Sequence, residues 1–105
     1  MRRVIPPSTK AFRRTQEEAF FHPILSVLRE LGGSAKVDPI LRKVERRVGH
    51  TFTQDDRAPI KSGEPRWRNT AKRARKRLVE RGLLKANSPR GWWELSERGR
   101  QEAER

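Results

Sequence analysis

The stretch RWRNTAKRARKRLVERGLL, residues 66–84, has the pattern of a helix and an unusual concentration of positive charge. Four of its positions fall within about 60° of one another on a helical wheel and predict a buried stripe: Trp67, Ala71, Ala74 and Leu78. Gly82 predicts the end of this helix. The question is what the charge on the rest of its surface does.

The opposite side of the predicted helix is basic. It carries Arg68, Asn69, Lys72, Arg73 and Lys76, with Arg75 and Arg77 on its flanks. Residues 66–77 hold seven positive charges and no acidic residue. Like charges one turn apart oppose a helix, so a face that is merely solvated usually mixes both signs. We therefore favour contact with a polyanion over a role in solubility alone.

The charge of the whole chain supports this interpretation. The 105 residues suit one domain, and 26 Lys and Arg against 13 Asp and Glu give a net charge of +13. Residues 66–90 contribute +9 and residues 1–14 contribute +5, whereas residues 15–65 balance eight basic against eight acidic residues. Two patches therefore carry the imbalance, and a nucleic acid is the simplest partner with a dense negative surface.

The composition also excludes several classes of protein. There is no cysteine, so disulfides and thiolate metal sites are excluded. No apolar run approaches the roughly 18 residues of a membrane span, and no apolar segment follows the basic N-terminus as a secretory signal would require. We expect a soluble, cytoplasmic, nucleoid-associated protein that has no membrane partner.

The N-terminal third predicts an arm and a helix. Residues 1–14 contain five basic residues and Pro6-Pro7, and we expect a flexible basic arm. The domain should begin at Thr15, which would cap a helix together with Glu18 three residues later. Gly32-Gly33 would end that helix.

The middle of the chain predicts a second helix and a short turn. Residues 34–36 fit a brief strand. Asp38 is expected to cap the following helix, with Pro39 at its first position and Gly49 at its end. Thr53 with Asp56 would cap one further helical turn in the polar segment that follows.

The C-terminal part predicts a β-hairpin. Residues 83–85 and 92–95 read as its strands, and ANSPRG between them is turn material. Strand alternation places Trp93 with Leu95 on a core face and Trp92 with Glu94 on the other. Ser96 would cap a last helix. The order of elements predicts a mainly α protein with a small β-hairpin, namely a winged helix with three core helices and a wing over residues 15–105.

A winged helix places its third helix in the major groove of DNA. Outward residues would then meet base edges, and flanking arginines would meet phosphates. The wing tip, with Lys85 and Arg90, would reach phosphates or the minor groove. Asn69 has two alternative roles, as the cap of the helix or as a base contact. The candidate DNA-binding residues are Arg66, Arg68, Asn69, Thr70, Lys72, Arg73, Lys76, Arg77, Lys85, Ser88 and Arg90.

The second half of the chain resembles the N-terminal winged-helix domain of Mrr-type restriction endonucleases. The resemblance covers about residues 19–100 and is carried by Ser62-Gly63, Pro65, Trp67, Asn69, Ala74-Arg75, Leu78, Gly82-Leu83-Leu84, Ser88-Pro89-Arg90-Gly91, Trp93 and Ser96-Glu97-Arg98-Gly99. Arg73 departs from the family pattern, which often has an aromatic residue there. The resemblance implies a module that recognises targets on double-stranded DNA, often methylated, and is attached to a separate PD-(D/E)xK nuclease domain.

A methylated base adds apolar surface against which a tryptophan can pack. Trp67 is the first candidate for such a contact and Trp92 the second, and each has an alternative role in packing. Whether adenine or cytosine methylation is read, and whether any is, stays open.

The residues predict no catalytic site and no cofactor. Asp55-Asp56 is an adjacent acidic pair, and neighbouring residues do not face the same way, so a capping role is expected. His22 and His50 have no partners at metal-ligand spacing. The alternatives to a targeting module are a free-standing transcription regulator, a small phage or archaeal DNA-binding protein, an RNA-binding protein and a protein-interaction winged helix. We expect a monomer or weak dimer.

Overall fold

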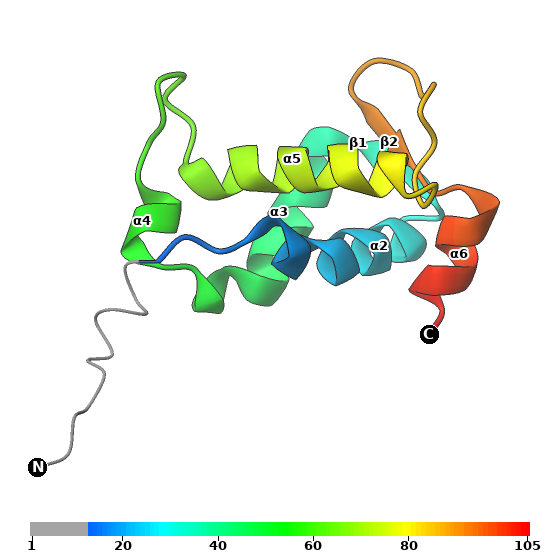
Figure 1. The fold of residues 1–105 in the computed structure, drawn as a ribbon, viewed down its shortest axis with the longest axis horizontal. Coiled ribbons are helices and arrows are strands. Elements are labelled where there is room, and N and C mark those ends of the chain that lie inside the picture. Colours follow the sequence, from blue (N-terminus) through cyan, green and yellow to red (C-terminus); the bar gives the residue numbers. More distant parts are fainter. Residues whose placement is uncertain (1–12) are drawn as a thin grey trace, which may run out of the picture.

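The structure, a computed structural model, describes residues 13–105. The elements in chain order are η1 (Glu17–Phe20), α2 (Phe21–Glu30), β1 (Ser34–Lys36), α3 (Val37–Val48), η2 (Gly49–Thr51), α4 (Gln54–Arg57), α5 (Arg66–Glu80), β2 (Trp92–Glu94) and α6 (Glu97–Ala103). Helices α2, α3 and α5 form the body, and β1 and β2 form a small antiparallel sheet (Figure 1). The predicted winged-helix arrangement is confirmed. Most of the predicted arm, residues 1–12, lies outside the described residues.

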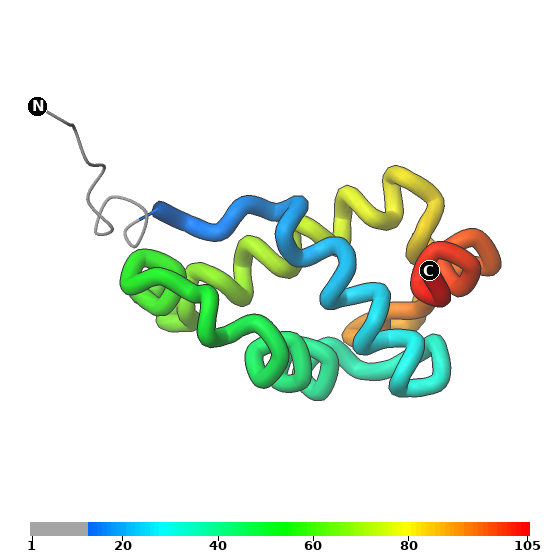
Figure 2. The backbone as a smooth tube through the Cα atoms, turned by 90° about the horizontal axis from the view of Figure 1, so that it is seen from below, coloured from blue at the N-terminus to red at the C-terminus, as the bar shows by residue number. Residues whose placement is uncertain are grey.

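Helix α2 is the central element of the core. It contacts α3, α5 and α6; Figure 1 shows it below α5, and Figure 2 shows it beside α3. The predicted stripe of α5 is buried against this body, with Ala71 and Ala74 fully buried. Because alanine side chains are small, the backbone of α5 can lie close to its neighbours. One face of α5 is therefore fixed, which determines the face that it presents to solvent.

An aromatic cluster holds the first turns of α5. The Trp67 ring stacks on Phe52 at 5.0 Å and on Phe20 at 6.5 Å between ring centroids, and Phe20 lies 5.9 Å from Phe52. Such arrangements stabilise beyond the area that they bury. Trp67 is 2% exposed, so it belongs to the core.

The first helix does not begin as predicted. The expected capping box of Thr15 with Glu18 is wrong, because Thr15 donates its backbone N–H (2.8 Å) and its hydroxyl (2.6 Å) to the Asp56 carboxylate. A 3-10 turn begins instead at Glu17, and no side chain caps it. The reason is that a buried carboxylate requires donors, and Thr15 supplies two of them. Gly32 and Gly33 end α2 as predicted, both with positive φ.

The second helix, by contrast, begins earlier than predicted. Helix α3 starts at Val37, so the expected cap at Asp38 is wrong, and Pro39 stands in the first turn, where the missing N–H costs nothing. Asp38 instead pairs with Arg42 (3.5 Å) and Arg68 (2.7 Å). Asp38 therefore forms an ion pair with Arg68 of α5 and does not cap α3.

The two other predicted caps are confirmed. Thr53 and Asp56 form a reciprocal capping box at the start of α4. At the start of α6, the hydroxyl of Ser96 accepts the N–H of Gly99 at 2.9 Å and donates to the Gly82 carbonyl at 2.6 Å. Ser96 therefore joins α6 to the turn that follows α5.

The wing is smaller than the predicted hairpin. Strand β2 pairs with β1, with Ala35 opposite Trp93, whereas the predicted strand 83–85 is reduced to one bridge between Leu84 and Leu95. The Lys85 N–H still donates to the Glu94 carbonyl at 2.9 Å before the chain leaves as a loop. The predicted alternation is confirmed, since Trp93 and Leu95 are buried while Trp92 and Glu94 are partly exposed.

We predict that Asp56→Asn lowers the free energy of unfolding by about 2 kcal/mol at neutral pH, because an amide cannot accept all three hydrogen bonds from Thr15 and Thr53. Burial raises the pKa of Asp56, but these hydrogen bonds outweigh burial and the pKa is lowered on folding. The contribution of the carboxylate should therefore be complete above its unfolded pKa of about 3.9 and be lost as the pH falls through the lower folded pKa.

Urea titrations of both proteins between pH 7 and pH 2.5 would measure this difference. Asp55→Asn is the matched control, since Asp55 makes only partly exposed ion pairs with Arg14 and Arg66. A stability difference between wild type and Asp56→Asn that persists unchanged at pH 2.5 would contradict the prediction.

We predict that Gly99→Ala destabilises the domain, although alanine normally favours a helix. A Cβ at Gly99 would lie 1.9 Å from the Leu83 carbonyl oxygen, so α6 and the segment after α5 would have to separate. A loss of about 1–3 kcal/mol is expected from such overpacking, measured by thermal or urea unfolding. An unchanged or raised stability would show that the two segments are not in close contact.

Candidate nucleic-acid interface

The outer face of α5, defined as Asn69, Lys72, Arg73 and Lys76, lies opposite the buried stripe. Lys72, Arg73 and Lys76 are solvent-accessible and Asn69 is half-buried. Asn69 is not the cap of the helix, because α5 begins at Arg66 with Pro65 in the cap position. The capping alternative for Asn69 is therefore wrong, and its amide is available at the solvent side of the first turns.

The positive charge of α5 is partly compensated by acids from other elements. The sequence predicts an acid-free face, but the fold brings carboxylates to four of the seven cations of residues 66–77. The pairs are Arg66 with Asp55 (3.7 Å), Arg68 with Asp38 (2.7 Å), Lys72 with Glu64 (3.1 Å), and Arg77 with Glu17 (3.4 Å) and Glu18 (2.7 Å). These acids come from segments that precede α5, and a pattern within α5 cannot show them.

The other three cations, Arg73, Arg75 and Lys76, form no ion pair within residues 13–105. Arg73 and Lys76 are solvent-accessible, whereas Arg75 has an Nε that is buried without a hydrogen-bond partner among the described residues. The uncompensated charge is therefore concentrated in the middle of the helix.

Arg77, one of the predicted contacts, is held by the fold. Its hydrogen bond lowers the pKa of Glu18, and the bond to Glu18 raises the pKa of Arg77 in turn. The Arg77 guanidinium also lies 5.4 Å from the centre of the Phe21 ring, a cation–π distance. Arg77 therefore ties α5 to the N-terminal turn.

Arg68 is fixed in a similar way on the other flank. Its hydrogen bond lowers the pKa of Asp38, and its guanidinium carbon lies 5.7 Å from the Trp67 ring. Its side chain is only 24% exposed. Trp67 lies beneath it, 2% exposed, and thus offers almost no free ring surface to a base in this structure.

The wing loop, residues 85–91, is organised by Glu94. This carboxylate accepts the hydroxyls of Ser88 (2.9 Å) and Ser34 (3.1 Å), and these two hydrogen bonds lower its pKa. Ser88, a predicted contact, is therefore bonded inside the wing. Lys85 and Arg90 are exposed on it, and half-buried Trp92 stands beside them on β2.

The start of the described chain, Arg13 and Arg14, lies beside α5 and adds two cations to the site. Arg13 and Arg14 line one hollow with Thr70 and Arg73 of α5. The Thr70 hydroxyl donates to the Arg66 carbonyl at 3.2 Å within the helix. The sequence predicts an arm that is separate from the helix, and nothing in a local pattern shows that its last two residues converge on Arg73.

Residues 13–105 contain neither a group of metal ligands nor a candidate membrane span. No three His, Cys, Asp or Glu residues of the part of the chain described here are placed to hold a metal ion. Between residues 13 and 105 there is no helix with the length and apolar character that crossing a membrane requires.

A family model described as the Mrr N-terminal domain matches residues 18–105, nearly the whole chain. The chain belongs to the Mrr N-terminal domain family. The match confirms the resemblance drawn from the sequence and associates the chain with restriction systems. No curated protein and no solved structure matches it.

Proposed function

We propose that this Mrr N-terminal domain binds double-stranded DNA and selects the target of a restriction system, with α5 in the major groove. The observation that carries the proposal is the pair of solvent-accessible cations Arg73 and Lys76, which lack an acidic partner within residues 13–105. Their mutual repulsion costs stability unless a polyanion relieves it. Arg and Lys on such a helix suit guanine edges and Asn69 suits adenine.

The surroundings of α5 favour contact with the DNA backbone. Lys85 and Arg90 on the wing loop, near the C-terminal end of α5, and Arg13 at the start of the described chain are exposed cations. The major groove is bordered by a phosphate backbone on each side, and basic residues around a helix in the groove position the protein without reading sequence. The proposal therefore assigns base contacts to Asn69, Arg73 and Lys76 of the outer face and phosphate contacts to these flanking cations.

The proposed role is binding without catalysis. Of the acidic pair Asp55-Asp56, Asp56 caps α4 and Asp55 forms ion pairs with Arg14 and Arg66. A restriction system built on this domain would need a nuclease domain to supply the cleavage chemistry, with this domain providing the target.

Recognition of a modified base is the finer part of the proposal. Trp92 is the tryptophan whose ring is partly exposed beside the basic loop, whereas Trp67 and Trp93 are buried. A methyl group on a base would gain apolar contact with such a ring. We assign Trp92 to this contact.

We predict that Arg73→Ala with Lys76→Ala weakens duplex binding by about 100-fold at 0.1 M salt. Each cation removed from the interface reduces the number of counterions that the DNA releases on binding. This lowers the slope of log affinity against log salt by about 0.9, so removing two cations should lower it by about 2. The measurement is fluorescence anisotropy with a labelled duplex at several salt concentrations.

The control is Arg29→Ala with Arg46→Ala, which removes the same charge from the last turns of α2 and α3. These two residues are exposed and belong to other helices of the body. An equal weakening in both double variants would mean that net charge, and not the outer face of α5, governs binding.

We predict that matched duplexes carrying N6-methyladenine or 5-methylcytosine differ in affinity from the unmodified duplex. One contacting methyl group contributes about 0.8 kcal/mol, or about fourfold. Trp92→Ala should remove the preference for the modified duplex and leave the affinity for the unmodified one nearly unchanged. Equal affinities of wild type for all three duplexes would exclude modification recognition and leave DNA binding intact.

A further inference from the structure

Residues 58–65, between α4 and α5, form a second closed hairpin. Pro59 and Pro65 pair across its base. The Arg66 N–H donates to the Ala58 carbonyl at 2.9 Å, and the Ile60 N–H donates to the Glu64 carbonyl at 2.9 Å. The sequence predicts only a polar segment rich in turns here.

The turn of the 58–65 hairpin is fixed as well. The Gly63 N–H donates to the Ile60 carbonyl at 2.8 Å, and Gly63 has φ of 94°, a conformation that glycine adopts without strain. Two prolines further restrict the backbone. A loop with this many internal constraints loses little entropy when it binds.

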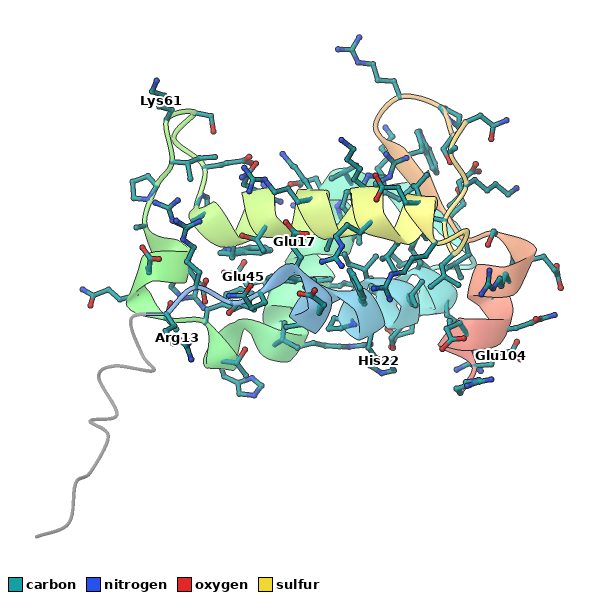
Figure 3. All side chains as sticks on the ribbon, viewed as in Figure 1. Arg13, Glu17, His22, Glu45, Lys61 and Glu104 are labelled. Carbon is teal, nitrogen blue, oxygen red and sulfur yellow. The ribbon has the colours of Figure 1, made fainter. Side chains whose placement is uncertain are left out.

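The 58–65 hairpin and the wing loop rise on the same side of α5. Figure 1 shows one at the N-terminal end of the helix and the other at its C-terminal end. Figure 3 shows Lys61 at the outermost point of the 58–65 hairpin. Helix α5 has 15 residues, so the two loops stand roughly 22 Å apart along it at about 1.5 Å per residue.

The tip of the hairpin presents donors and no free carboxylate. Lys61, Ser62 and Gly63 are exposed, and within residues 13–105 the backbone N–H groups of Lys61 and Ser62 donate no hydrogen bond. Glu64, the acid of the hairpin, is bound by the Lys72 ammonium at 3.1 and 3.3 Å. This pair neutralises the acid and fastens the hairpin to α5.

We propose that the 58–65 hairpin is a second wing whose tip binds a phosphate of the DNA strand opposite to the one that the wing loop contacts. The inference rests on the proposed DNA-binding function. Phosphate oxygens accept hydrogen bonds only, which matches an ammonium and two free amides. With α5 lying across the major groove, which is about 12 Å wide, loops roughly 22 Å apart along the helix axis reach past both edges of the groove. In this arrangement Lys72 is a positioning residue for the hairpin.

The first test is the salt dependence of duplex binding by Lys61→Ala. Removal of one phosphate interaction should lower the salt slope by about 0.9, which corresponds to about an eightfold weaker affinity at 0.1 M salt. Lys61→Arg should retain the wild-type slope. Arg29→Ala is the control for removal of one charge, and because Lys61 is exposed, the thermal transition should not change.

The second test measures proximity and uses the absence of cysteine in the chain. Single variants Lys61→Cys, Arg90→Cys and Arg29→Cys carry a photo-crosslinker at one defined position each. Positions 61 and 90 should both crosslink to a duplex, and position 29 should not. With the strands labelled separately, positions 61 and 90 should mark different strands.

The outcomes separate the second wing from the proposed function. A reduced slope for Lys61→Ala together with crosslinking from position 61 supports the second wing. An unchanged slope, or crosslinking from position 61 no stronger than from position 29, overturns it, while the effect of the Arg73 and Lys76 variant still supports DNA binding by α5. If wild-type protein shows no salt-dependent binding to any duplex, the proposed function itself fails.

Discussion

The close packing of α5 against the body of the domain is the constraint on which the surface depends. Ala71 and Ala74 are fully buried, and Trp67 fixes the first turns through its aromatic neighbours. With one face committed to the core, all seven cations of residues 66–77 must lie on the flanks and the outer face, where like charges repel one another. Carboxylates from earlier segments relieve this repulsion on four of them.

Features determined by neighbours in the sequence could be predicted, and features determined by distant partners could not. The buried stripe of α5, the alternation in the wing and the Ser96 cap follow from local periodicity and spacing. Two predicted helix starts are wrong because their polar side chains bind elsewhere. Thr15 binds Asp56, 41 residues away, and Asp38 binds Arg68, 30 residues away. Tertiary hydrogen bonds there replace local caps.

The candidate site shows the same difference between features set by sequence neighbours and features set by distant partners. The sequence predicts the basic helix and which of its faces is buried, but it cannot show which of its cations form ion pairs within the fold. Arg77 binds Glu18 at a separation of 59 residues, and Lys72 binds Glu64 in a hairpin whose strand pairing involves two prolines, residues that ordinarily argue against strands. The direction in which that hairpin projects depends on how α4 and α5 are joined, which no periodic pattern encodes.

The residues that carry the family resemblance and those that would select a target are largely different. Ser96 and Gly99 join α6 to the segment after α5, Ser88 holds the wing loop to Glu94, and Trp67 lies in the core. These positions maintain the frame. Arg73, where the resemblance implies a departure from the family pattern, is solvent-accessible on the outer face. A position open to solvent can change without disturbing the packing, so under the proposed function members of one family can share this frame and select different targets.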